Sequence, residues 1–143
     1  MRVVGLGELV IMEHTMRAKV EFPEMRAEVV GALRALSDPD YQRTRWGRYV
    51  GGVDYYDDLD LNIHILYDDC QVLPSPEWAV PQILHEDEIP VLLAVEAALG
   101  PMIRELGDRP DAEYVEDPRW AGVLSAAGVA CAVLQDNDEG GRA

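Results

Sequence analysis

Hydrophobic residues recur at helical spacing in the first firm element of the chain, Pro23–Leu36. Its apolar positions are three or four residues apart and so fall on one helix face: Met25, Val29, Leu33 and Leu36. Pro23 suits the first helical position, and the helix ends before Pro39 because the residue preceding a proline avoids the α conformation. Residues 40–46 predict either a short helix or the start of a strand. Residues 1–20 lack a clear period, and we treat them as an N-terminal extension with at most one strand within Val3–Ile11.

Two further helices are predicted in the second half of the chain. One runs from Glu88 to Leu106, with Asp87 as its cap and Gly100-Pro101 as a point where it kinks or divides. Its inward positions are Ile89, Leu92, Leu93, Leu99, Ile103 and Leu106. The other starts at Pro118 behind an Asp117 cap. It is expected to bury Trp120, Leu124, Cys131 and Leu134.

Between these helices the pattern changes to an alternation, which is the period of a half-buried strand. Over Leu59–Tyr67 the apolar Leu59, Leu61, Ile63 and Ile65 alternate with the polar Asp58, Asp60, Asn62 and His64. Gln71–Leu73 predicts a short return strand. We therefore expect an α+β fold of about three helices packed on a short antiparallel sheet. Residues 21–135 form a single globular domain in this prediction, and residues 136–143 form a frayed polar tail.

The overall composition fits one soluble domain. With 143 residues and 48% hydrophobic content the chain is long and apolar enough to bury a core, despite a net charge of −15. No apolar run reaches membrane-spanning length, and no cleavage site follows the apolar start, so we predict no membrane contact and a cytoplasmic location. Cys70 and Cys131 stand far apart without a C-x-x-C motif and are expected to be reduced thiols.

The charge is concentrated in the middle of the chain. Residues 49–103 carry eleven Asp/Glu and no Lys or Arg, whereas residues 1–48 have a net charge of +1 and residues 104–143 of −5. A nucleic-acid partner is disfavoured, because phosphate binding needs a basic surface. A basic protein partner is favoured, because such a field attracts oppositely charged surfaces. General solubility explains the acidity about equally well.

The polar side of the predicted strand raises the question of a metal or catalytic site. On a strand, Asp60 and His64 would lie about 13 Å apart, too far for a compact set of metal ligands. We predict a solvated face, with no metal and no cofactor. The alternative is a small hydrolase or metal-dependent enzyme in which His64 acts as a base beside Asp58 or Asp60. No serine or cysteine stands near His64 as an evident nucleophile.

Aromatic residues precede the acidic stretch and suggest an interaction surface. Tyr41, Trp46, Tyr49, Tyr55 and Tyr56 are interleaved with Arg43, Arg45 and Arg48. Such residues are enriched in interface hot spots, although burial of Trp46 in the core accounts for much of the pattern. The predicted binding residues are Asp54, Tyr55, Tyr56, Asp57, Asp58, Asp60, Asn62, Asp68 and Asp69. A homodimer that uses the aromatic group and Val3–Ile11 is a further alternative.

Four segments together resemble a family of small acidic actinobacterial proteins of uncharacterised function. They are PEMRAEVVGALRALSDPDYQRTRW, YYDDLDLNIHILYDD, QVLPSPE and ELGDRPDAEYVEDPRW. The resemblance spans residues 22–134 and implies no activity or catalytic residue. By analogy alone, the size and acidity are similar to those of immunity proteins that block basic toxins. The leading hypothesis is a non-catalytic binding module, immunity-like or regulatory, with an acidic surface for a basic protein.

Overall fold

The computed structural model describes residues 19–48 and 56–140, and within them the fold is all-α. The α-helices are α2 (Pro23–Leu36), α3 (Pro39–Arg45), α4 (Leu59–His64), α5 (Ile89–Leu106), α6 (Asp111–Val115) and α7 (Trp120–Gly140). A π-helical turn, Ile65–Asp69, continues α4, and Pro76–Ala79 and Glu86–Glu88 form 3-10 turns. The described ranges contain no strand, only an isolated bridge between Trp46 and Asp57. The predicted α+β fold with an antiparallel sheet is therefore wrong.

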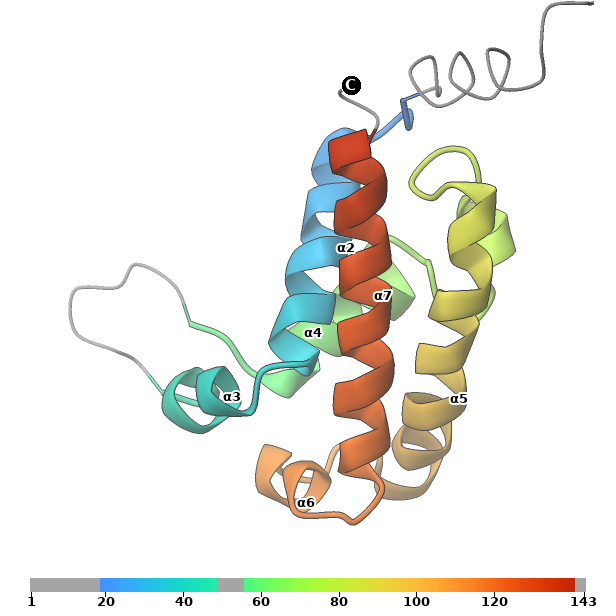
Figure 1. Cartoon of the computed structure of the whole chain (residues 1–143). Helices are drawn as coiled ribbons and strands as arrows, with labels where there is room; N and C mark the ends of the chain where they lie inside the picture. Colours follow the sequence, from blue (N-terminus) through green and yellow to red (C-terminus); the bar gives the residue numbers. More distant parts are fainter. Residues whose placement is uncertain (1–18, 49–55, 141–143) are drawn as a thin grey trace, which may run out of the picture.

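Three long helices, α2, α5 and α7, form the body of the molecule (Figure 1). α7 packs against both of the others and lies between them in this view. α4 and its π-helical continuation pack against α2. The core is mainly aliphatic and includes Trp46 and Trp120. Their rings pack edge to face, with their centroids 6.2 Å apart. None of the described helices has both the length and the apolar character needed to cross a membrane.

The helix predicted at Pro23–Leu36 is confirmed with the same bounds. Of the two alternatives for residues 40–46, the helix is the one that forms, as part of α3. Asp38 caps α3, because its carboxylate accepts a hydrogen bond from the backbone N–H of Tyr41 at 3.0 Å. Helix propensity and proline positions were sufficient signals here, since both helices carry a proline in their first turn.

The predicted helix over Glu88–Leu106 is confirmed as α5, although its start is built differently. The Glu88 carboxylate accepts a hydrogen bond from the backbone N–H of His85 at 2.9 Å, where a cap by Asp87 was expected. α5 continues through Gly100-Pro101 as one element. The third predicted helix is confirmed as α7, but it starts at Trp120 and not at Pro118. Of the four side chains expected inside it, Trp120, Cys131 and Leu134 are buried and Leu124 is half-buried.

A buried ion pair with its hydrogen bonds links α2, the start of α5 and the last turn of α7. Arg26 and Glu88 are 4% and 0% exposed. All five N–H donors of the Arg26 guanidinium are used. They bond to the carboxylates of Glu88 and Asp138 and to the backbone carbonyls of Ile83 and Leu134. Because Asp138 is part of this network and α7 runs to Gly140, the frayed tail predicted from residue 136 is wrong up to residue 140.

The predicted strand Leu59–Tyr67 is also wrong, because this segment is helical. Its buried positions are three or four residues apart: Leu59, Asn62, Leu66 and Cys70. Leu61, which the alternation placed inside, is 42% exposed. The polar Asn62 is buried and the apolar Leu61 is exposed, the reverse of what their side chains suggest. This reversal makes the helical segment look like an alternating strand in the sequence. Asp58 starts the helix, since its carboxylate accepts a hydrogen bond from the backbone N–H of Leu61 at 2.8 Å.

The return strand predicted at Gln71–Leu73 is wrong, because this segment has an irregular backbone and pairs with no strand among the described residues. The backbone N–H groups of Val72 and Leu73 both bond to the carbonyl of Leu66, at 3.0 and 3.1 Å. The chain thus turns back on the end of the π-helical turn, and Gln71 adopts a positive φ of 53° to allow it. Strand-forming residues are used here to fill the core, where Val72 and Leu73 are buried.

Candidate functional site

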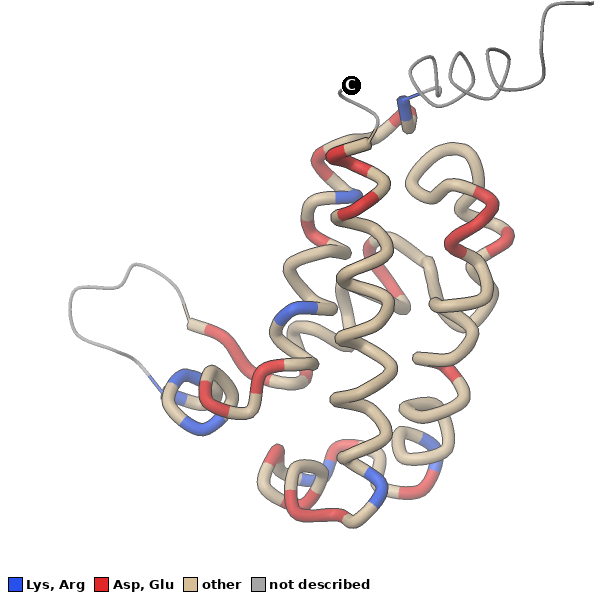
Figure 2. Tube along the Cα trace, in the orientation of Figure 1, with Lys and Arg blue, Asp and Glu red and all other residues tan. Residues whose placement is uncertain are grey.

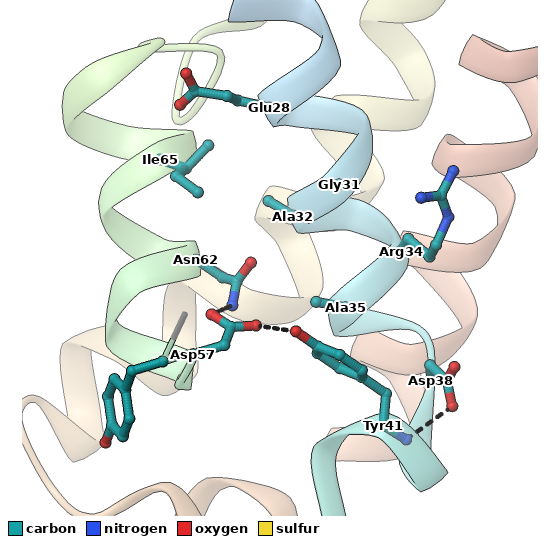
Figure 3. A pocket seen from close by; sticks show the side chains of 11 residues that line it. Glu28, Gly31, Ala32, Arg34, Ala35, Asp38, Tyr41, Asp57, Asn62 and Ile65 are labelled. Atoms are coloured by element: carbon teal, nitrogen blue, oxygen red, sulfur yellow. Dashed lines mark hydrogen bonds between the residues drawn. The ribbon is translucent and has the colours of Figure 1, made fainter. Parts of the chain in front are cut away.

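A groove of about 410 Å³ lies between α2 and α4, and Tyr41 of α3 meets Asp57 at one end of it (Figure 3). Its α2 wall is small and apolar, and α4 with the turn after it contributes Asn62 and Ile65. The α2 wall consists of Gly31, Ala32 and Ala35, and the other lining residues are Glu28, Arg34, Asp38, Tyr41, Tyr56 and Asp57. The lining thus holds three carboxylates and one guanidinium. In Figure 3 the Arg34 side chain points away from α4.

Asp57 is held at the end of the groove by four neutral donors. Its Oδ2 accepts hydrogen bonds from the Tyr41 hydroxyl (2.7 Å) and the Trp46 indole N–H (3.2 Å). Its Oδ1 accepts from the side-chain amide of Asn62 (3.0 Å) and from the backbone N–H of Asp58 (2.9 Å). These bonds fix the carboxylate in position without a positive partner, so its negative charge still acts on the groove.

Asn62 presents an unused acceptor to the same groove. Its amide nitrogen donates to Asp57 Oδ1 (3.0 Å) and to the carbonyl of Asp58 (2.8 Å), two partners that accept only. These bonds require the nitrogen at that position, so the other end of the amide is the oxygen. Asn62 Oδ1 has no hydrogen-bond partner among the described residues, and Figure 3 shows it directed toward α2 across the groove. The residue as a whole is only 3% exposed.

Outside the groove lining, α4 and the turn that follows it carry an acidic face. We define it as the exposed carboxylates Asp60, Asp68 and Asp69. In the described part of the chain, the ion pairs of Arg and Lys involve none of the acids between residues 57 and 69. The chain trace in Figure 2 carries Asp and Glu but no Lys or Arg from residue 56 to the C-terminal part of α5. Among the described residues, this face is therefore paired with His64 but with no Lys or Arg.

His64 lies on the acidic face and not in the groove. Its Nδ1 bonds to Asp68 and its Nε2 lies 3.5 Å from Asp60 Oδ2, because residues four apart are neighbours on a helix. The separation of about 13 Å expected on a strand is therefore wrong. The hydrogen bond to Asp68 and the charge of Asp60 raise the pKa of His64 above 6.5. Its side chain is 53% exposed, so solvent reaches the imidazole freely.

Asp111 joins this region from a distant part of the chain, which the sequence did not indicate. Its Oδ2 accepts a hydrogen bond from the backbone N–H of Leu59 at 3.1 Å. Burial, and then the charges of Asp58, Asp60 and Asp57, raise the pKa of Asp111 above 3.8. Burial is the largest cause of this shift, and the three neighbouring carboxylates add to it. Asp111 follows Pro110 and is the first residue of α6, and a proline followed by an acidic residue is the signal in the sequence for such a helix start.

The structure separates the predicted binding residues into groups with different roles. Tyr56, Asp57 and Asn62 line the groove, Asp58 caps α4, and Asp60, Asp68 and Asp69 are exposed. Asp54, Tyr55, Tyr49 and the segment Val3–Ile11 lie outside the described residues. The continuous polar row predicted on one strand face does not exist, because a helix distributes these side chains over several directions.

The arrangement around His64 offers little for catalysis. Asp58 is engaged with the backbone N–H of Leu61, and His64 is paired with Asp60 and Asp68 on an open surface. Cys70 is buried, and burial followed by the charges of Glu28 and Asp69 raises its pKa to about 11, which disfavours a thiolate. Within residues 19–48 and 56–140, no group of three or more His, Cys, Asp or Glu is placed to hold a metal ion.

Comparison with known proteins gives one result. The family model described as Domain of unknown function (DUF7945) matches residues 20–142, which is nearly the whole chain. No curated protein and no solved structure matches.

Proposed function

We propose that this chain, which belongs to the family Domain of unknown function (DUF7945), is a non-catalytic binding module for a basic protein. Its membership in an uncharacterised family agrees with the resemblance noted in the sequence. In this proposal the partner docks on the acidic face and on the mouth of the groove between α2 and α4. The observation that carries the proposal is the lack of any Lys or Arg ion pair to the acids of residues 57–69 in the described structure.

Exposed carboxylates that lack a Lys or Arg partner are suited to recognition for two reasons. Their summed field attracts a cationic surface and speeds its association, an effect that falls steeply with salt. Their positions are also fixed by the backbone: Asp60 belongs to α4, and Asp68 and Asp69 belong to the turn that packs on α2. Carboxylates that are already held in place lose little entropy when a partner binds.

Elsewhere in the described chain most arginines already have acidic partners. Arg26, Arg43, Arg104, Arg109 and Arg119 form ion pairs with Asp or Glu. The contrast with residues 57–69 supports a role for this surface beyond solubility. A cytoplasmic setting is part of the proposal and is supported by Cys70 and Cys131, both buried free thiols.

The proposal is tested by capture of a partner from lysate of the native source with the immobilised full chain, at low and at moderate salt. We expect one basic protein in stoichiometric amount, bound more strongly at low salt. That protein is then purified and its affinity for the chain measured at both salt concentrations. Failure to recover a basic protein at either salt, or an affinity that does not change with salt, contradicts the proposal.

A further inference from the structure

We propose that the groove between α2 and α4 receives an arginine side chain of the basic partner. This inference rests on the proposed function and deepens it, because it names the chemical group that the site recognises. It is carried by three separate features of the groove: an unused acceptor, a glycine that the fold does not require, and an excess of carboxylates. Together they point to a ligand that is long, cationic and rich in N–H donors.

The unused acceptor is the side-chain oxygen of Asn62. The residue is buried as a whole, but its oxygen is not among the buried side-chain atoms that lack a partner, so this acceptor remains open to solvent at the groove. Here both N–H groups are bonded and the residue is 3% exposed, yet the oxygen has no partner among the described residues. It borders the groove and faces α2 in Figure 3. A donor that enters the groove would complete the hydrogen bonding of this amide.

Gly31 has no structural reason to be glycine. It lies in the middle of α2, where glycine costs about 0.5–1 kcal/mol relative to alanine. Its φ lies outside the left-handed region, and a Cβ built on it meets no atom within 4 Å. Neither backbone strain nor packing therefore requires a missing side chain. Since Gly31 lines the groove, we infer that its absent side chain leaves room for an occupant close to the α2 backbone.

The charge of the groove favours a cation. Glu28, Asp38 and Asp57 line it, and the guanidinium of Arg34 points away from α4 in Figure 3. Glu28 forms no hydrogen bond or ion pair with other described residues. No positive group donates to Asp57 among the described residues, because all four of its donors are neutral. Glu28 and the Asn62 oxygen offer a ligand only acceptors, so the ligand must supply donors. Asp57 contributes its charge, since its two oxygens already accept four hydrogen bonds.

Arginine fits these requirements better than lysine. Its guanidinium carries five donors and no acceptor, is weakly hydrated, and lies favourably against aromatic rings. Its aliphatic stem suits the apolar part of the lining, which includes Gly31 and Ala32 on one side and Ile65 on the other. The Tyr41 ring already has one guanidinium over it, that of Arg45, at 5.7 Å from the ring centre. This contact is a direct example of guanidinium packing at the same end of the groove.

The direct probe is N-acetyl-arginine amide, with the neutral and nearly isosteric N-acetyl-citrulline amide as its control. Each compound is titrated into the isotopically labelled full chain, and amide and side-chain NMR shifts are followed. We expect the arginine compound to move the signals of Gly31, Ala32 and the Asn62 side chain, and the citrulline compound to leave them unchanged. Equal responses to both compounds, or no response at these groups, would overturn the inference.

A matched pair of glycine variants tests the location. Gly31→Leu fills the groove from α2, whereas Gly122→Leu adds the same side chain to α7, where a Cβ also meets nothing within 4 Å. We expect Gly31→Leu to abolish binding of N-acetyl-arginine amide and Gly122→Leu to leave it unchanged, with both variants folded. Glu28→Gln, which keeps the shape of the groove, should weaken the same binding. The inference fails if Gly31→Leu binds the probe as the wild type does.

The two proposals fail in different ways. If the captured basic protein binds Gly31→Leu as tightly as the wild type, the partner does not use the groove and the arginine inference falls while the proposed function stands. If no basic protein is captured, the proposed function falls, whatever the arginine probe does. If the captured protein loses affinity for Gly31→Leu but not for Gly122→Leu, and an arginine of that protein is required, both are supported.

Discussion

The Arg26 guanidinium and the Glu88 carboxylate face each other through two hydrogen bonds, at 2.9 and 2.6 Å, in the interior of the molecule. The pair joins α2 to the start of α5, and Asp138 extends it to the last turn of α7. Desolvation alone would raise the pKa of Glu88, but hydrogen bonds from Arg26, Asn137 and the His85 backbone reverse the effect. The result is a pKa below its usual 4.5.

We expect Glu88→Gln to lower the free energy of unfolding by about 3 kcal/mol, because it leaves the buried Arg26 charge with only the more exposed Asp138 as a counter-ion. Since the pKa of Glu88 is lowered in the folded state, its contribution is present above about pH 4.5 and is lost as the pH falls through the folded-state value. The difference between wild type and variant should therefore shrink in acid. Urea unfolding at several pH values measures this.

Glu86→Gln is the control for that measurement, because Glu86 lies two residues away and is exposed. It should change the free energy of unfolding by less than about 0.5 kcal/mol. Equal destabilisation by the two variants would mean that the buried pair contributes nothing beyond general charge effects.

His64 should titrate above 6.5, because its hydrogen bond to Asp68 and the charge of Asp60 favour the imidazolium. Its contribution to stability is then fully present below pH 6.5 and is lost as the pH rises through the folded-state pKa. We expect Asp68→Asn to shift the pKa back toward 6.5. NMR titration of the imidazole signals measures both values, and an identical pKa in the two proteins would contradict the pairing.

Replacing glycine by alanine at two positions should change the free energy of unfolding in opposite directions. Gly31→Ala should raise the free energy of unfolding by about 0.5–1 kcal/mol, because α2 gains a better helix former in open space. Gly107→Ala should lower it, since Gly107 ends α5 at a φ of +56°, where side chains are strained. Urea unfolding compares the two, and stabilisation by Gly107→Ala would contradict the backbone argument.

The sequence predicted the long helices well and the middle of the chain poorly. α2 follows from apolar spacing and a first-turn proline, signals that are local. α4 does not, because Asn62 is buried for a reason the sequence does not reveal: its amide bonds to Asp57 and Asp58. With Asn62 read as exposed, the best remaining pattern is alternation, and the strand prediction follows.

The sequence predicted the acidic character of the candidate site but not the groove. The acidic stretch is visible in the sequence, because charge requires no knowledge of the fold. The groove forms because Gly31 of α2 and Asn62 of α4 lie on opposite sides of it. Tyr41 of α3 closes one end through its hydrogen bond to Asp57. Such contacts between distant residues leave no local signal. The sequence also did not indicate that the carboxylate of Asp58 caps α4.

The most direct test of the central claim is the affinity of the captured basic partner for two charge-reversal variants of the full chain. Asp60→Lys with Asp69→Lys alters the acidic face at exposed positions that cap no helix. Asp136→Lys with Glu139→Lys makes the same change in net charge at exposed positions near the end of α7. We expect the first variant to lose binding at moderate salt and the second to retain it, with both as stable as the wild type. Equal affinity of the two variants, or loss of binding only in the second, would contradict the account.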